Sequence, residues 1–211
     1  MSFDELIYIV PAVIIAIVFH ELAHGIVSYW LGDPTPKSER RLSLNPFRHL
    51  DPVGTLCLIV FRFGWAKPVR VNPEHYRNPR LGMVFVALAG PITNFIIALI
   101  FRILVAALFF APRTSWLHHL LYNILYNITI INIGLGVFNL LPVPPLDGSK
   151  LIGALIPEKY YFTYLKYEIF GMILLLVLLA SGIFNTFLQE TVDGFFKVFG
   201  DIAVWVIGLF A

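Results

Sequence analysis

The sequence is poor in charged residues and contains a single cysteine. Of its 211 residues only 13% are charged and 58% are hydrophobic, whereas about a quarter of residues are charged in soluble globular domains. Together with a mean hydropathy of +0.80, this composition excludes an ordinary soluble domain and indicates a polytopic membrane protein. The lone Cys57 excludes an intrachain disulfide scaffold, and the net charge of +2 is too small to indicate nucleic-acid binding.

Long runs with few charged residues predict where the chain crosses the membrane, because a spanning helix needs about 20 apolar residues. Three core spans are predicted at residues 6–31, 81–110 and 117–141, and a further span at residues 169–189. Charged residues interrupt the segment 191–211, which is predicted to lie in the interface or to cross as well. We expect an all-α polytopic membrane protein with at least four spans, five or six being allowed, in one membrane-embedded domain over residues 1–211.

A polar loop at residues 32–80 separates the first two predicted spans. It carries nine basic against four acidic residues, and the positive-inside rule therefore places it in the cytoplasm. Residues 54–64 within this loop are apolar but too few to span the membrane. Their β-branched and aromatic side chains predict a small membrane-associated strand or β-hairpin between the first two spans.

His20, Glu21 and His24 form an HExxH pattern inside the first predicted span. On a helix, positions i and i+4 share one face, so the two imidazoles can bind one Zn²⁺ while the neighbouring carboxylate lies close enough to take a proton from water. Three ionisable side chains inside a span are costly unless they have a function or partners. A polar contact between helices is the alternative, but such contacts usually involve Ser, Thr, Asn or Gln.

Zinc requires a third protein ligand, and Asp147 is the best candidate. It follows a proline-rich segment, residues 142–145, that prevents a continuous helix. Irregular backbone at membrane depth is tolerated only inside protein or beside a water-filled cavity. An Asp-Gly pair is also typical of a helix cap or a turn. The residues alone therefore leave open whether Asp147 is a metal ligand or a cap or turn residue. The predicted topology favours the ligand, because the third span delivers Asp147 to the inner side of the membrane, where His20 and His24 also lie.

Three motifs resemble, in the same order, those of the site-2 protease family of intramembrane zinc metalloproteases. The first is the HExxH pattern itself, the second is Gly90-Pro91-Ile92-Thr93-Asn94 (GPxxN), and the third is the NxxPxPxxDG pattern of residues 139–148. Parts of the loop, such as Leu44-Asn45-Pro46, resemble the small prokaryotic members that lack accessory domains. The resemblance implies a three-helix catalytic core, one Zn²⁺ per chain bound by His20, His24 and Asp147, and peptide-bond hydrolysis within or next to the membrane.

Roles follow from this combination of residues. Glu21 is expected to act as the general base, which removes a proton from water and passes it to the leaving amine. Asn94 and Asn139 lie on the other two core spans and are expected to contact the oxyanion or the substrate backbone. Hydrogen bonding between helices is the alternative role for both asparagines.

The expected function is zinc-dependent cleavage of transmembrane protein or peptide substrates in the cell membrane, with the active site towards the cytoplasmic side. This would serve regulated intramembrane proteolysis or the clearance of membrane peptides. A metal-ion transporter is an alternative, but it would need further polar ligands along a path through the membrane. An inactive, substrate-binding relative is a third reading, against which the intact Glu21 argues.

Overall fold

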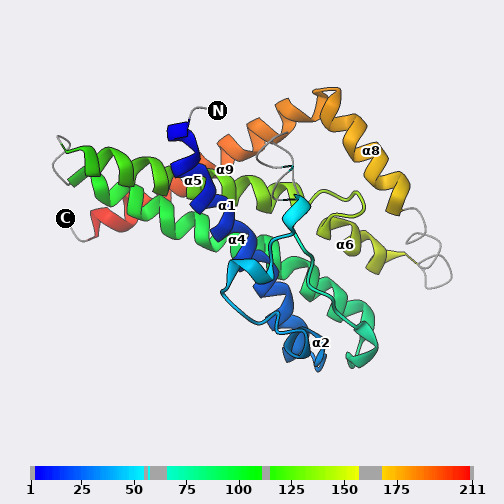
Figure 1. Ribbon diagram of the computed structural model, residues 1–211. Coiled ribbons are helices and arrows are strands. Elements are labelled where there is room, and N and C mark those ends of the chain that lie inside the picture. The colour runs from blue at the N-terminus through cyan, green and yellow to red at the C-terminus, as the bar shows by residue number, and fades with distance from the viewer. Residues whose placement is uncertain (1–2, 55–56, 58–65, 111–114, 157–167, 210–211) are drawn as a thin grey trace.

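The computed structural model describes residues 3–54, 57, 66–110, 115–156 and 168–209. The described residues form an all-helical fold, as the composition predicts (Figure 1). The helices are α1 (Phe3–Trp30), α2 (Thr35–Ser38), α4 (Pro79–Ala107), α5 (Trp116–Asn139), α6 (Asp147–Leu155), α8 (Glu168–Ala180) and α9 (Ile183–Gly208). Short 3-10 turns are η1 (Pro46–Arg48), η2 (Pro73–His75) and η3 (Leu108–Phe110).

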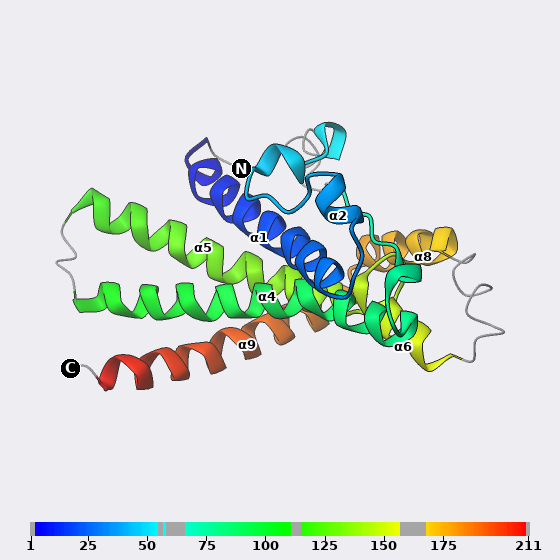
Figure 2. The same cartoon turned by 90° about the horizontal axis from the view of Figure 1, so that it is seen from below.

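Three long apolar helices, α1, α4 and α5, pack against one another and form the core (Figure 2). The segments Glu5–Trp30, Pro79–Phe110 and Trp116–Asn139 are long and apolar enough to cross a membrane, with mean hydropathies of 2.3, 2.4 and 1.5. They nearly coincide with the three predicted core spans. Between 22% and 33% of the residues in their most apolar windows are buried inside the protein.

Local sequence signals set the ends of the second and third core helices. Asn78 and Ser115 cap α4 and α5, because each side-chain oxygen accepts a hydrogen bond at 3.2 Å from a backbone N–H of the first helical turn. Helix α5 ends at Asn139, just before the prolines, and α6 begins at Asp147. The chain therefore turns at the prolines, as predicted, and Asp147 opens a new helix.

The predicted strand or β-hairpin at residues 54–64 lies almost entirely outside the described residues. Within the described ranges there is no β-strand, so the hairpin has no support from the structure. At its two sides, Leu50 and Ala66 form an isolated antiparallel bridge. The Lys67 N–H donates to the His49 carbonyl oxygen at 2.8 Å, so the two ends of this segment are held together.

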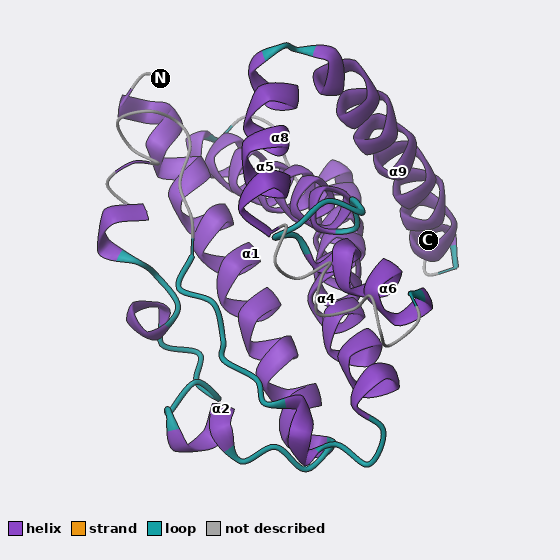
Figure 3. Ribbon diagram, turned by 90° about the vertical axis from the view of Figure 1, so that its right-hand side faces the viewer, coloured by secondary structure: helices purple, strands orange, loops and turns teal. Residues whose placement is uncertain are grey.

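The predicted further span at residues 169–189 is not a continuous helix. Helices α8 and α9 are separated at Gly182, whose φ of +73° favours glycine and ends α8 with a left-handed turn. The two helices are bent by 83° and meet at the top of the view in Figure 3. Up to four crossings are compatible with the described helices if this bent pair counts as one span. The segment 191–211 is therefore largely the continuation of α9.

Helices α8 and α9 pack on different parts of the core. Helix α9 lies against α4 and α5, where the rings of Phe95 and Phe195 stack with centroids 4.8 Å apart. Helix α8 instead covers the proline segment, because its Leu175 forms a buried cluster with Leu141 and Leu146. This packing supports the backbone that leads directly into Asp147.

Candidate metal centre and active site

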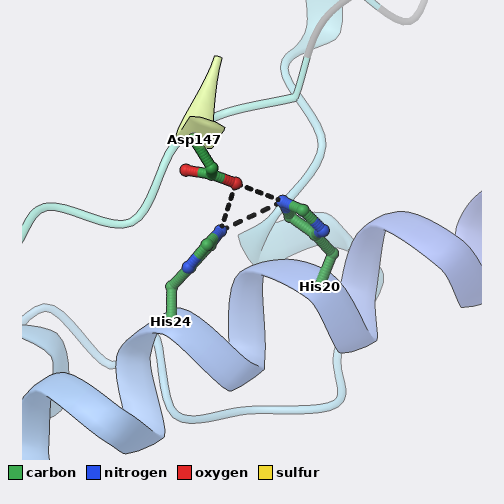
Figure 4. Close-up of side chains that lie close together, drawn as sticks. All are labelled: His20, His24 and Asp147. Carbon is green, nitrogen blue, oxygen red and sulfur yellow. Dashed lines mark hydrogen bonds and ion pairs between the residues drawn. The ribbon is translucent and has the colours of Figure 1, made fainter. Parts of the chain in front are cut away.

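The side chains of His20, His24 and Asp147 converge at one point (Figure 4). The two histidines project from adjacent turns of α1, and Asp147 reaches them from the start of α6. The Nε2 atoms of His20 and His24 are 3.0 Å apart, and Asp147 Oδ2 lies 3.1 Å from the first and 3.0 Å from the second. The three residues are only 5%, 7% and 6% exposed, respectively.

The protonation of the two rings makes this cluster suited to a cation. Nδ1 of His24 donates to the Val86 carbonyl oxygen at 2.7 Å, and Nδ1 of His20 donates to Asn94 Oδ1 at 2.6 Å. With the proton on Nδ1, each neutral imidazole directs the lone pair of Nε2 towards the carboxylate. Two lone pairs and an anionic oxygen repel one another at these distances unless a positive charge lies between them.

The donor set and the spacing fit zinc. Catalytic zinc sites have three protein ligands, commonly imidazole nitrogens with or without a carboxylate oxygen. A tetrahedral zinc ion with bonds of about 2.0–2.1 Å separates its ligand atoms by about 3.4 Å. The observed separations of 3.0 to 3.1 Å are close to this value, so small shifts of the side chains would accommodate the ion.

Asn94 belongs to a buried polar network behind the histidines. Its Nδ2 donates to the Ala16 carbonyl oxygen at 3.1 Å and to Asn132 Oδ1 at 2.8 Å, while its Oδ1 accepts from His20. Asn94 and Asn132 are both fully buried. The network links α1, α4 and α5 and orients the His20 ring, and it leaves no N–H of Asn94 for an oxyanion.

Asn132 is the residue of this network that sequence analysis missed. The available signal was a polar side chain in the middle of the third apolar span, because an asparagine at membrane depth needs hydrogen-bond partners. Asn139, by contrast, forms no hydrogen bond with His20 or His24 within the described residues. Its Nδ2 donates to the Leu135 carbonyl oxygen of the same helix at 3.0 Å.

The carboxylate of Asp147 uses its two oxygens differently. Oδ2 faces the histidines, and Oδ1 accepts a hydrogen bond from Lys150 Nζ at 2.8 Å. The residue before Asp147, Leu146, occupies the N-cap position of α6, and no side chain caps the helix there. Asp147 therefore does not serve as the helix cap that its sequence also allowed.

Glu21 lies beside the cluster and is 9% exposed. Its Oε2 accepts a hydrogen bond at 2.8 Å from the backbone N–H of Val69, a loop residue 48 positions later in the chain. One carboxylate oxygen is thus fixed by the backbone.

Comparison with known proteins identifies the class of protein. The family model described as Peptidase family M50 matches residues 111–181. YwhC of Bacillus subtilis is 39% identical over 201 residues, which cover 92% of each chain. Zinc metalloprotease MJ0392 of Methanocaldococcus jannaschii is 26% identical over 88% of this chain and 46% of its own length. MJ0611 of the same organism is 32% identical over 72% of this chain and 73% of its own length.

YwhC and MJ0611 are also named as zinc metalloproteases, in both cases as a provisional assignment. No solved structure matches the chain. The apolar helices and these relatives define the class of protein: a zinc metalloprotease of the membrane, with Zn²⁺ as its cofactor. The chain belongs to peptidase family M50, the site-2 proteases, as its motifs predict.

Proposed function

We propose that the protein is an intramembrane endopeptidase: a single membrane-embedded protease domain that uses zinc to cleave transmembrane segments of protein or peptide substrates. The observation that carries this proposal is the convergence of three ligand atoms inside a bundle of apolar helices. Regulated intramembrane proteolysis or the clearance of membrane peptides would be served by such cleavage. The basic loop after α1 supports an active site that opens towards the cytoplasmic side of the cell membrane.

In this proposal His20, His24 and Asp147 hold the metal. Zinc, when bound, activates water and polarises the carbonyl group that is attacked. Asn94 and Val86 hold the two imidazole rings in the tautomer that ligation requires. Asn94 is thereby assigned to orienting His20 in place of the expected oxyanion contact.

Glu21 is the proposed general base. With Oε2 held by the Val69 N–H, Oε1 takes a proton from the attacking water. The carboxyl group then gives this proton to the nitrogen of the leaving amine as the C–N bond breaks. A contact of Asn139 with the substrate backbone stays in the proposal, since its bond to Leu135 uses one of two N–H groups on Nδ2.

The test is the cleavage of single-span substrates by purified, zinc-loaded protein in lipid vesicles, with Glu21→Gln as the control. We expect cleavage by the wild type. Glu21→Gln should bind one zinc per chain but lose activity by at least about 10²- to 10⁴-fold, the usual contribution of a general base. A variant that still cleaves would refute the role of Glu21. Absence of cleavage by the wild type, together with metal flux in sealed vesicles, would favour the transporter.

Replacing Asn94 with leucine should weaken zinc binding by about 10- to 100-fold, the usual effect of losing a partner of a metal-ligating histidine. Leucine has a similar size but cannot accept the hydrogen bond from His20 Nδ1. Zinc affinity is measured by competition with a chelator. Asn127→Leu is the matched control, because the hydrogen bond that Asn127 Nδ2 forms within the described residues stays in its own helix, to the Asn123 carbonyl oxygen at 2.7 Å. Equal affinities of the two variants would remove Asn94 from the site.

A further inference from the structure

An extended loop segment, residues 66–72, passes beside the HExxH motif; we call it the strap. Backbone and side-chain hydrogen bonds fasten it on both sides of Val69. Upstream, the Lys67 N–H donates to the His49 carbonyl oxygen at 2.8 Å. Downstream, the Asn72 N–H donates to Asp33 Oδ2 at 2.7 Å. Between these points, the Val69 N–H donates a hydrogen bond to Glu21 Oε2 at 2.8 Å.

The downstream end of the strap is bound to Asp33, a fully buried residue. Its carboxylate also accepts hydrogen bonds from Ser28 Oγ at 2.7 Å and from the Thr35 N–H at 2.9 Å. Burial opposes the ionisation of Asp33, but the hydrogen bonds from Thr35, Asn72 and Ser28 outweigh it and lower the pKa of this carboxyl. The strap is therefore anchored to the end of α1 by an ionised side chain.

Arg41 provides a second upstream contact to the strap, also at Lys67. Its Nη2 donates to the Lys67 carbonyl oxygen, only two residues before the amide that binds Glu21. Arg41 is 3% exposed, and within the described part of the chain its Nε and Nη1 have no hydrogen-bond partner. A buried guanidinium with a single hydrogen bond is costly unless a nearby negative charge compensates it.

Glu21 is the carboxylate that best supplies this compensation. Burial lowers the pKa of Arg41, while the charges of Glu21 and Glu39 act in the opposite direction. Glu39 lies at the surface, where its side chain is 34% exposed and 3.6 Å from Arg70. Glu21 is buried, and the strap binds it at Val69, two residues beyond Lys67, which Arg41 contacts.

We propose that Arg41 is a positioning residue for the general base: it holds the strap so that the Val69 N–H fixes Glu21 Oε2 and leaves Oε1 to take the proton. This rests on the proposed function of Glu21. Among the described residues, the Arg41 side chain forms no hydrogen bond with His20, His24 or Asp147. Its effect should thus appear in the chemical step and not in zinc binding.

The first experiment compares Arg41→Gln with wild type in the zinc-loaded, full-length protein. We expect kcat to fall by about 10²-fold, the effect of a misplaced catalytic group. The KM and the zinc affinity should be unchanged. Arg41→Lys should restore most of the activity, because one ammonium group can donate to the Lys67 carbonyl and keep the charge. Arg70→Gln is the matched control on the same strap, since Arg70 is 82% exposed. An unchanged kcat in Arg41→Gln, or a fall in zinc affinity that accounts for the loss, would overturn the proposal.

A second variant separates the strap from the arginine itself. Val69→Pro removes the N–H that binds Glu21 but keeps Arg41. If the two residues act as one unit, Arg41→Gln combined with Val69→Pro should be no less active than the worse single variant. Losses that multiply in the double variant would show separate roles and overturn the proposal.

Amide hydrogen exchange distinguishes failure of this inference from failure of the proposed function. The strap should exchange slowly in the wild type and faster in Arg41→Gln, whether or not Glu21 is the base. If exchange does not change, Arg41 does not hold the strap, even where Glu21→Gln is inactive. If exchange responds but Glu21→Gln still cleaves substrate, the assignment of Glu21 is wrong, and with it the role of Arg41 as its positioning residue.

Discussion

Asp147→Asn should abolish tight zinc binding and, as a consequence, all peptidase activity. Asparagine has the shape of aspartate, so the packing around the start of α6 should be preserved. It lacks the negative charge that faces the two Nε2 lone pairs, and the ammonium of Lys150, now 2.8 Å from Oδ1, would lose its anionic partner. A loss of zinc affinity well above about 100-fold is expected, because loss of a hydrogen-bond partner behind a ligand already costs about 10- to 100-fold.

The measurement is the zinc content of the purified protein after dialysis, together with the dissociation constant from chelator competition. Asp201→Asn is the control, since Asp201 is an exposed residue of α9. It should retain one zinc per chain and full activity. Stoichiometric zinc in Asp147→Asn with unchanged affinity would show that the third ligand lies elsewhere.

The core of the fold could be predicted because it depends on composition and spacing. Long apolar runs with few charged residues predict helices α1, α4 and α5 to within three residues at each end. The approach of Asp147 to the histidines could also be anticipated, since the predicted topology ends the third span on the side of the membrane where the HExxH motif is expected. Neither step required knowledge of side-chain packing.

The bend between α8 and α9 could not be found in the same way. Hydropathy averages over a window, and a Ser-Gly pair within an apolar run hardly lowers it. The break depends instead on the backbone of Gly182, which takes a positive φ. Whether a glycine does so is decided by what the two flanking helices pack against: α8 on the proline segment and α9 on α4 and α5.

The hydrogen bonds that the polar residues behind the site form could not be predicted from the sequence. Asn94 was recognisable as a polar residue of a core span, but which of its atoms are used depends on the rotation of α4 against α1 and α5. The hydrogen bond from Val69 to Glu21 comes from a backbone amide, which carries no residue-specific signal at all. Sequence motifs identify side chains that bear chemistry and some of their polar neighbours, whereas the atoms that form each orienting hydrogen bond are known only from the structure.

Gly90→Ala should inactivate the protein as completely as loss of a ligand, although Gly90 has no side chain that could take part in the reaction. This glycine of α4 faces the imidazole rings. A Cβ there would lie 2.5 Å from His20 Cε1, 2.6 Å from His24 Nε2 and 2.7 Å from His20 Nδ1. Both rings are held by hydrogen bonds through Nδ1, so neither can rotate away without losing its partner. The methyl group must therefore separate α4 from α1 or displace the ligand atoms.

Gly134→Ala in α5 is the matched control, because a Cβ at Gly134 would meet no atom within 4 Å. Both changes replace glycine by alanine inside a long helix and should raise intrinsic helix propensity by about 1 kcal/mol. A general effect of alanine would therefore appear in both variants, whereas a steric effect on the metal site would appear in one. We expect Gly134→Ala to keep its zinc and its kcat/KM, and Gly90→Ala to lose at least about 100-fold in both zinc affinity and kcat/KM, beyond the loss of one supporting hydrogen bond. If Gly90→Ala retained zinc and activity, α4 could not pack against the histidines as closely as the structure has it.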